Sequence, residues 1–333
     1  MRERSNCVGH GDHRSSSDLE VLDFSQKVMW REIVAVSLEK NGEPNQTSAR
    51  LSRPPKESPM KCQRFLSIPV SAVLLLMGFV YYITLFVFIE DWVGLQSSAG
   101  SLNALIFSFL GFLCLVSFSA CVLIDPGHVP PSYVPDVEQS RASDQEPNNN
   151  GAQPRPCDKC FTYKPPRAHH CRICRRCVLR MDHHCMWINN CVGYWNYKAF
   201  FVLVLYAAIS SIYSTVVLIS CSFQKDFSGR VPLKMFYVIC GAGMIGLSVT
   251  FGTLLGWHVY LIIHNMTTIE YHEGVRAAWL AEKSGQNYRH PFYRSVYQNI
   301  TSVLGPNMLK WLCPTAVSHL KDGLAFPISH DSL

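Results

Sequence analysis

The chain alternates between long apolar runs without charged side chains and polar segments that carry the charges. The first run, residues 66–89, has 24 residues and no ionisable side chain other than tyrosine. As a helix rising about 1.5 Å per residue it would measure about 36 Å, more than the roughly 30 Å hydrocarbon core of a bilayer. Further runs at 103–124, 199–221 and 238–263 pass the same test. The pattern predicts four transmembrane helices.

Buried helices of a soluble core are the alternative to this prediction. Helices in soluble domains rarely lack charge over such a length, and here the pattern occurs four times, which favours membrane spans. The fourth run holds His258, its only titratable residue besides cysteine and tyrosine. We interpret His258 as a polar side chain satisfied inside the bundle, with a ligand role as the alternative.

Lysine and arginine are unevenly distributed among the polar segments. Eleven precede the first run, ten lie in 125–198 and six follow residue 263, whereas 90–102 has none and 222–235 has three. Because cytosolic segments of membrane proteins carry the excess of Lys and Arg, both termini and the 125–198 loop are predicted to be cytosolic. Residues 288–313 of the 264–333 tail are expected to pack on this loop or to lie in the membrane interface.

The N-terminal segment, residues 1–65, is polar, poor in aromatic residues and without the apolar stretch of a secretory signal. Its composition predicts a poorly ordered segment. Met60 lies shortly before the first run and would itself make a suitable start, so we expect 1–59 to be dispensable for insertion and activity. Residues 132–154 are predicted to form a flexible linker.

Composition narrows the class of protein further. Charged residues make up 16% of the chain and hydrophobic residues 48%, with a net charge of +6. This mixture is unusual for a soluble protein and excludes an acidic disordered chain, a collagen-like fibre and a strongly basic nucleic-acid binder. The spans lack Asp, Glu, Lys and Arg and show no evident inverted repeat, which argues against a transporter.

Cysteine and histidine gather in one short part of the 125–198 loop. Seven of the fourteen cysteines and four histidines lie between Cys157 and Cys191. A Cys-x2-Cys-x9-His-x6-Cys frame starts at Cys157 and occurs again, shifted by fourteen residues, from Cys171. In a reducing cytosolic loop, such a density indicates metal binding rather than disulfides.

Each frame supplies three thiolates and one imidazole, a ligand set that binds structural zinc in tetrahedral geometry. We predict two zinc ions, and we expect the loop to need them to fold because few apolar residues lie between the ligands. His169 could replace His170 in the first site. The predicted ligands are Cys157, Cys160, His170 and Cys177 for the first ion, and Cys171, Cys174, His184 and Cys191 for the second.

Cys185 is the cysteine of this region that the two sites leave over. It lies where a third copy of the frame would begin, fourteen residues after Cys171, but Ile188 stands in place of the next cysteine. A spare thiol and an alternative zinc ligand are two interpretations. The neighbouring residues favour a third, a nucleophile, because His183 can take the thiol proton while Asp182 orients the imidazole and stabilises its charged form.

The sequence Asp182-His183-His184-Cys185, within this frame and flanked by four spans, resembles the DHHC family of protein S-acyltransferases, and its plant members in particular. The resemblance covers about residues 66 to 305. It includes the places where the family keeps its DPG, TTxE and C-terminal asparagine motifs, here Asp125-Pro126-Gly127, Thr267-Thr268-Ile269-Glu270 and Asn299. The chain departs from the commonest pattern at Met186, where proline usually follows the DHHC cysteine.

The resemblance implies an all-α multi-pass membrane protein with four transmembrane helices and a cytosolic two-zinc DHHC domain at 155–198. It implies palmitoyl-CoA or another long-chain acyl-CoA as co-substrate and membrane-associated proteins with cytosolic cysteines as acceptors. Cys185 would carry the acyl group, with His183 as the base and Asp182 orienting it. Span length and the habit of the family favour the Golgi or another endomembrane over the plasma membrane.

Further residues receive roles from the resemblance. Lys164 and Arg167 are expected to bind the phosphates of coenzyme A, with an ordinary solvated charge as the alternative for each. Trp187 is expected to line the cavity near the thioester, or to anchor the loop at the interface. The expected structural supports are Asp125, Thr267, Thr268, Glu270 and Asn299, with Thr268 bonding Asp182 and Asn299 tying the tail to the loop. For Asp125, Thr268 and Asn299, ordinary cap and turn residues are the alternative.

The second candidate function is a membrane-anchored zinc-binding adaptor in which Cys185 is catalytically idle. This alternative shares the two metal sites and lacks the acyl-enzyme. A zinc finger that binds nucleic acid is disfavoured, because the frame lacks the usual x12 spacing and its recognition helix would be held at a membrane.

Overall fold

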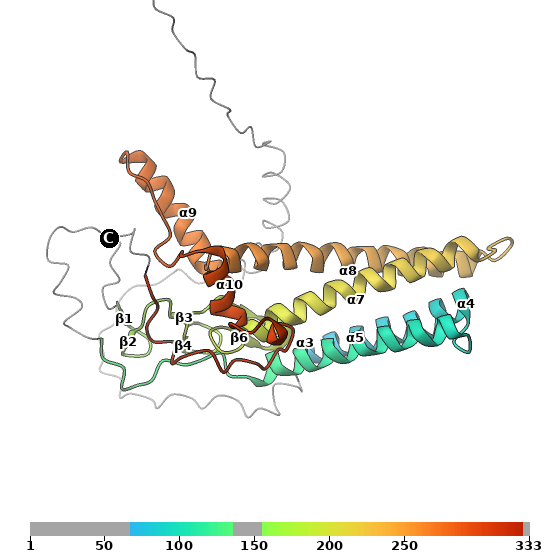
Figure 1. Cartoon of the computed structure of the whole chain (residues 1–333), viewed down its shortest axis with the longest axis horizontal. Helices are drawn as coiled ribbons and strands as arrows, with labels where there is room; N and C mark the ends of the chain where they lie inside the picture. Colours follow the sequence, from blue (N-terminus) through green and yellow to red (C-terminus); the bar gives the residue numbers. More distant parts are fainter. Residues whose placement is uncertain (1–66, 136–154, 329–333) are drawn as a thin grey trace, which may run out of the picture. The chain divides into compact units, whose positions relative to one another are not determined.

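The structure is a computed structural model that describes residues 67–135 and 155–328. The described residues all belong to one compact unit, Glu57–Leu333. Long helices make up most of it, with three small β-hairpins at one end of the helices (Figure 1). The predictions of a poorly ordered segment at 1–65, a dispensable extension at 1–59 and a linker beyond residue 135 lie outside the described residues.

Four helices of the described chain are long and apolar enough to cross a membrane. The first runs without a break through α3 (Ile68–Ile83), the π-helical turn η1 (Thr84–Ile89) and α4 (Glu90–Val93). The others are α5 (Ser98–Leu123), α7 (Tyr197–Gln224) and α8 (Val231–Ile263).

The helices are longer than the predicted spans at the ends away from the hairpins. The first helix continues past 89 through Glu90 and Asp91, and α8 begins at Val231 rather than at 238. The predicted spans include only the apolar part of each helix. The helical backbone continues beyond it into polar residues, so the helices are longer than the spans.

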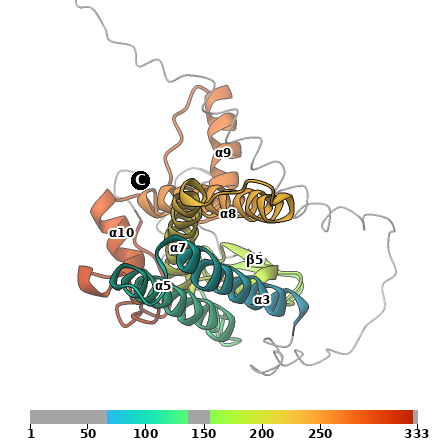
Figure 2. The same cartoon turned by 90° about the vertical axis from the view of Figure 1, so that its right-hand side faces the viewer.

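The helices run antiparallel, and α7 packs against both α5 and α8 (Figure 2). Large apolar side chains remain exposed on their outer faces, including Leu75, Phe79, Leu105 and Phe109. A water-soluble protein rarely exposes so much contiguous apolar surface, whereas lipid chains accept it. The predicted fold class, a mostly helical protein with four membrane-crossing helices and a cysteine-rich domain between them, is confirmed.

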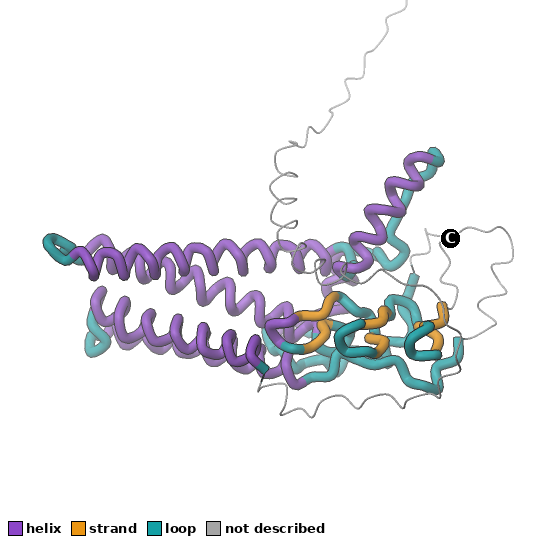
Figure 3. Tube along the Cα trace, turned by 180° about the vertical axis from the view of Figure 1, so that it is seen from behind, coloured by secondary structure: helices purple, strands orange, loops and turns teal. Residues whose placement is uncertain are grey.

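The cysteine-rich segment forms three successive antiparallel hairpins (Figure 3). They pair β1 (Arg155–Cys157) with β2 (Thr162–Lys164), β3 (His169–Cys171) with β4 (Arg176–Val178), and β5 (His183–Cys185) with β6 (Asn190–Val192). Each turn has a residue with positive φ at the same position: Phe161, Arg175 and Asn189 have φ of 56°, 54° and 46°. The fourteen-residue repeat of the sequence is therefore a repeat of one hairpin.

The C-terminal tail returns to the hairpin end of the bundle. It contains α9 (Thr268–Lys283), α10 (Val296–Leu304) and the short turn η3 (Met308–Lys310). Lys198, at the start of α7, is buried, and its Nζ donates hydrogen bonds to the carbonyl oxygens of Leu304, Lys310 and Ala316 at 2.8, 2.8 and 2.9 Å. One ammonium group thus fastens three points of the tail to the third membrane helix.

Candidate active site and metal centres

Four ligand atoms meet in each of two clusters. His170 Nδ1 lies 3.6, 3.2 and 3.9 Å from the Sγ atoms of Cys157, Cys160 and Cys177. His184 Nδ1 lies 3.7, 3.5 and 3.5 Å from those of Cys171, Cys174 and Cys191. A tetrahedral zinc ion with bonds of about 2.3 Å to sulfur and about 2.0 Å to nitrogen sets these atoms about 3.5 Å apart. Both clusters fit zinc.

The clusters have the predicted members, and the first contains His170 rather than the alternative His169. In each cluster the histidine and the last cysteine are cross-strand partners, His170 with Cys177 and His184 with Cys191. The two other thiols come from the hairpin before. Each cluster therefore joins one hairpin to the next, which explains why the two frames interleave in the sequence.

The third hairpin supplies a histidine and a cysteine to the second cluster and has no cluster of its own. Cys185 ends β5 in the same place where Cys157 ends β1 and Cys171 ends β3. Ile188 takes the place of the second cysteine of the turn and is buried among apolar side chains. Cys185 is therefore left as a free thiol in a position that is a metal ligand in the first two hairpins.

Asp182, His183 and Cys185 interact in series. His183 Nδ1 donates to Asp182 Oδ2 at 2.6 Å, and the His183 imidazole also interacts with the side chain of Cys185. Burial opposes the charged state of all three groups, but these interactions outweigh it. They hold the pKa of Asp182 at about 2, raise the pKa of His183 to about 10 and bring the pKa of Cys185 below its usual value. The arrangement favours an imidazolium beside a thiolate.

Backbone groups of the following turn, η2 (Met186–Ile188), contribute to the same thiol. The backbone N–H groups of Ile188 and Trp187 help to lower the pKa of Cys185 and so favour the thiolate. Met186 is the first residue of this turn, the position of a helix that proline favours. The turn forms with methionine in this place.

The thiol faces the apolar end of the helix bundle. Cys185 is only 9% exposed and packs in one cluster with side chains from all four membrane helices, among them Val70, Phe118, Phe200 and Ile262. The ring of Phe200 lies edge-on to His183 at 5.2 Å between centroids. The reactive sulfur therefore lies where the polar hairpins meet the apolar bundle.

Asp182 is held from the far side by the start of α9. Thr268 donates to it twice, from its backbone N–H at 2.8 Å and from its hydroxyl at 3.0 Å. The expected bond between these two residues is present in the structure. Thr267 caps the same helix: its hydroxyl accepts from the N–H of Glu270 at 3.2 Å, and the Glu270 carboxylate accepts from the Thr267 N–H at 2.9 Å.

Arg167 lies in a place that does not suit its expected contact with a phosphate. Its side chain is 1% exposed, and it forms a two-point ion pair with Glu270 at 2.6 and 2.7 Å. It also donates to the side-chain and main-chain oxygens of Asn265 at 3.2 and 2.8 Å, and it stacks on Phe292. Its hydrogen-bonding capacity is used inside the protein, so Arg167 joins the second hairpin region to α9 instead.

We expect Glu270→Gln to lower stability by about 3–5 kcal/mol, because the change leaves the buried Arg167 charge without its counter-ion. Glutamine keeps the shape and the helix cap, so the loss would report the charge. Thermal unfolding of the zinc-loaded protein in detergent measures it. Glu273→Gln, an exposed change one turn along α9, is the control. Equal melting points for the two variants would contradict a stabilising ion pair.

Comparison with known proteins adds independent information. Residues 150–275 match the model of the DHHC palmitoyltransferase family. The chain is 66% identical over 258 residues to "Probable protein S-acyltransferase 15" of Arabidopsis thaliana, covering 77% of this chain and 100% of that protein. It is 50% identical to "Probable protein S-acyltransferase 16" of the same plant, covering 80% and 94%. The chain belongs to the DHHC palmitoyltransferase family.

A fungal relative agrees with this membership. "Palmitoyltransferase pfa3" of Emericella nidulans is 34% identical over 72% of this chain and 49% of its own length. The resemblance that the sequence motifs predicted is confirmed, and the Arabidopsis relatives agree with the similarity to plant members. Four membrane-crossing helices and this membership together make the chain a multi-pass membrane protein.

The remaining family motifs have structural roles in this DHHC protein. Asp125 accepts from the Gly127 N–H at 2.9 Å and pairs with Arg176 at 2.8 Å, which fastens the end of α5 to β4. Gly127 has φ of 101°, and a Cβ there would lie 2.9 Å from the Trp195 ring. Asn299 is buried and donates to the Ile263 carbonyl at 2.7 Å, so it ties the tail to the end of α8 rather than to the loop.

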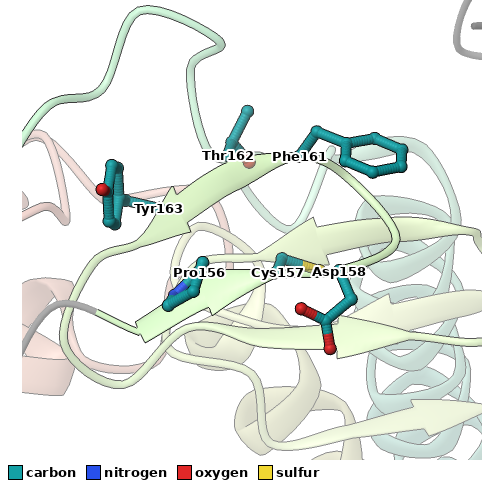
Figure 4. A pocket seen from close by; sticks show the side chains of 6 residues that line it. All are labelled: Pro156, Cys157, Asp158, Phe161, Thr162 and Tyr163. Carbon is teal, nitrogen blue, oxygen red and sulfur yellow. The ribbon is translucent and has the colours of Figure 1, made fainter.

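Lys164 and Trp187 remain accessible, unlike Arg167. Lys164 ends β2 with a partly exposed side chain, and Trp187 is 56% exposed beside Cys185. A small surface pocket of this DHHC domain lies on the first hairpin (Figure 4), with Pro156, Cys157, Asp158, Phe161, Thr162 and Tyr163 along it. It is on a different hairpin from Cys185 and contains none of the residues of the Asp182–Cys185 chain.

Two residues of the site region were not predicted from the sequence. Asn265 accepts from Arg167, Arg180 and His290 through its side-chain or main-chain oxygen, so it collects three side chains at the end of α8. Lys198, which binds three carbonyl oxygens of the tail, is in the sequence one of the ten basic residues of 125–198. A lysine directly before an apolar run is the ordinary pattern of an interfacial residue, so the sequence gives no signal of its burial.

Proposed function

We propose that this DHHC enzyme, a protein S-acyltransferase, transfers a long-chain acyl group, palmitate in particular, from acyl-CoA to protein cysteines through an acyl group on Cys185. One observation carries the proposal. Asp182 is hydrogen-bonded to His183, and His183 interacts with Cys185, the cysteine that the described metal clusters leave out. An imidazole that can take the thiol proton and a carboxylate that orients it are the parts of a cysteine nucleophile.

In the first half-reaction, the Cys185 sulfur attacks the carbonyl carbon of the acyl-CoA thioester. The bond from that carbon to the Cys185 sulfur forms, and the bond to the coenzyme A sulfur breaks. His183, which holds the proton of the Cys185 thiol, returns a proton to the leaving thiolate. Asp182 stabilises the imidazolium in between, fixed in turn by Thr268.

In the second half-reaction, the thiol of a substrate protein attacks the acyl group on Cys185. His183 takes the proton of the incoming thiol and gives it to the Cys185 sulfur as that sulfur leaves. A thioester is exchanged for a thioester in both steps, so no other energy source is needed. Asp182, His183 and Cys185 thus act in both half-reactions.

The location of Cys185 supports a long acyl chain as the group that is transferred. The sulfur packs against the ends of the membrane helices, so an acyl chain bonded to it would extend among apolar side chains. Each buried methylene contributes about 0.8 kcal/mol, which favours long chains. Trp187, exposed beside the sulfur, is proposed to line the entry of the chain.

The polar head of acyl-CoA would then lie over the hairpins. Lys164 stays a proposed phosphate contact because its ammonium group is accessible, whereas the buried Arg167 is not part of this proposal. The zinc ions would hold the three hairpins together through the two clusters. Their ligands leave Cys185 free, so the metals supply structure and take no part in the transfer.

We also propose that both termini and the hairpins are cytosolic and that the protein resides in the Golgi or a neighbouring endomembrane. The excess of Lys and Arg in 125–198 and before the first span supports this orientation. Substrates would be membrane-associated proteins with cytosolic cysteines close to the bilayer, where Cys185 lies.

His183→Ala tests the proposal. We expect it to lower the rate of Cys185 acylation by palmitoyl-CoA at least about 100-fold, since a general base contributes 10²–10⁴-fold. The zinc content should stay the same, because His183 is not a ligand. The measurement is label from alkyne-palmitoyl-CoA that hydroxylamine removes, followed with time on purified protein.

His169→Ala is the matched control for this variant. His169 has the place in the second hairpin that His183 has in the third: it precedes a ligand histidine and pairs with a valine across the strands. It should acylate at the wild-type rate. If His183→Ala also does so, His183 does not activate Cys185 as proposed. If the wild type takes no label, the adaptor function becomes the better account.

A further inference from the structure

His258 is a buried histidine within the fourth membrane helix. Its side chain is almost fully shielded, and Nδ1 lies 3.0 Å from the hydroxyl of Tyr197 at the start of α7. An ionisable side chain in a membrane span is unfavourable, and such residues generally have a function and a partner that can be named. Tyr197 is the partner, and the structure also shows what the ring is next to.

The ring of His258 packs beside the catalytic histidine. Its centroid lies 6.3 Å from that of His183 and 5.1 Å from that of Phe200, which itself lies 5.2 Å from His183. His258 and Phe200 therefore form two walls against one imidazole. Tyr197 is fixed in turn, because its ring carries the Arg180 guanidinium at 5.5 Å.

His183 needs such walls for its task. A histidine ring turns about its Cβ–Cγ bond in broad wells, so one hydrogen bond to Asp182 does not by itself define the plane of the ring. The imidazole can exchange a proton with the Cys185 sulfur only over part of that range. A misplacement of about 1 Å in a reacting group can lower a rate by about 100-fold.

We propose that His258 is a positioning residue for the His183–Cys185 pair. The bond to Tyr197 fixes the plane of the His258 ring, and that ring together with Phe200 keeps the His183 ring aimed at the Cys185 sulfur. The inference deepens the proposed function and rests on it. It gives a task to the histidine of the fourth span, which acyl transfer does not otherwise use.

Two isosteric variants and their combination test the inference. Tyr197→Phe removes only the hydroxyl, and His258→Phe keeps a ring of similar size without the bond. Each is expected to lower the maximal rate of Cys185 acylation about tenfold, with the palmitoyl-CoA concentration for half-maximal rate unchanged. The double variant should also lose about tenfold rather than about 100-fold, because both changes remove the same bond.

Tyr237→Phe is the control, since Tyr237 is a buried tyrosine of α8 that bonds Asp91 at the other end of the bundle. It should acylate at the wild-type rate. Zinc content and melting temperature show whether each variant is folded. If His258→Phe loses its zinc, the acylation rate of Tyr197→Phe alone tests whether the Tyr197–His258 bond positions His183.

A His258→Phe protein at the wild-type rate would overturn the inference, because the ring would then only fill space. Losses that multiply in the double variant would overturn it as well, because the two residues would act separately. Failure of the proposed function gives a different result, a wild-type protein that takes no label on Cys185.

Discussion

Cys185→Ser will take no hydroxylamine-sensitive label from alkyne-palmitoyl-CoA and will transfer nothing to a substrate protein. The expected loss of acylation is at least about 1000-fold, the largest of any single substitution. A serine hydroxyl in this place stays protonated at neutral pH. The imidazolium–thiolate pair favoured by His183 therefore cannot form. Zinc content separates this result from a loss of structure, because Cys185 belongs to neither cluster and about two ions per chain should remain.

Cys313→Ser is the matched control for this substitution. Cys313 is an exposed thiol in the tail, so it tests whether any accessible cysteine of the protein collects the label. It should be acylated on Cys185 at the wild-type rate. Equal label in wild type and Cys185→Ser, or loss of zinc from Cys185→Ser, would contradict the assignment of Cys185 as the nucleophile. Either result would favour a zinc-binding adaptor.

The spans and the metal clusters could be predicted because their signals are local. A membrane helix excludes charge over its whole length, and a cluster places its ligands at short, repeated intervals along the chain. The same repeat identified Cys185, since Ile188 breaks the third copy at the position where a ligand would stand. In these cases the physics acts between residues that are close in sequence.

Arg167 shows why other roles could not be predicted. In the sequence it resembles Lys164, a basic residue three positions away in the same polar loop. Its partner Glu270 lies 103 residues further on, beyond two membrane helices, and only the folded chain brings the two together. Burial decides between a phosphate contact and an internal ion pair, and the sequence around Arg167 contains no sign of that burial.

Asn299 and Lys198 are cases of the same kind. Each donates to backbone carbonyl oxygens, Asn299 to that of Ile263 and Lys198 to those of three residues of the tail. Every residue has a backbone carbonyl oxygen, so the sequence does not indicate which residue will accept the hydrogen bond. The family motif indicated that Asn299 holds the tail, while the surface that it holds the tail against had to come from the structure.

Loss of the second zinc cluster will abolish acylation even though Cys185, His183 and Asp182 are all intact. In Cys174→Ser we expect about one zinc ion per chain and a loss of acylation of more than about 100-fold. The reason is the position of His184: it is a ligand between the base and the nucleophile, and the cluster is what joins the third hairpin to the second. Structural zinc contributes about 10–16 kcal/mol to the folding of small domains, far more than three short hairpins gain by pairing alone.

Cys160→Ser is the matched comparison, because Cys160 is the equivalent thiol of the first cluster, fourteen residues earlier. It should also lose about one zinc ion but should keep much more of its acylation activity. The first cluster joins the first and second hairpins, and the first hairpin additionally packs against Tyr194 and the tail residues Leu320 and Leu324. Zinc content, protease resistance of the hairpins and the acylation rate together measure the difference. Equal loss of activity in the two variants would show that the clusters act as one unit, and that the second has no special relation to Cys185.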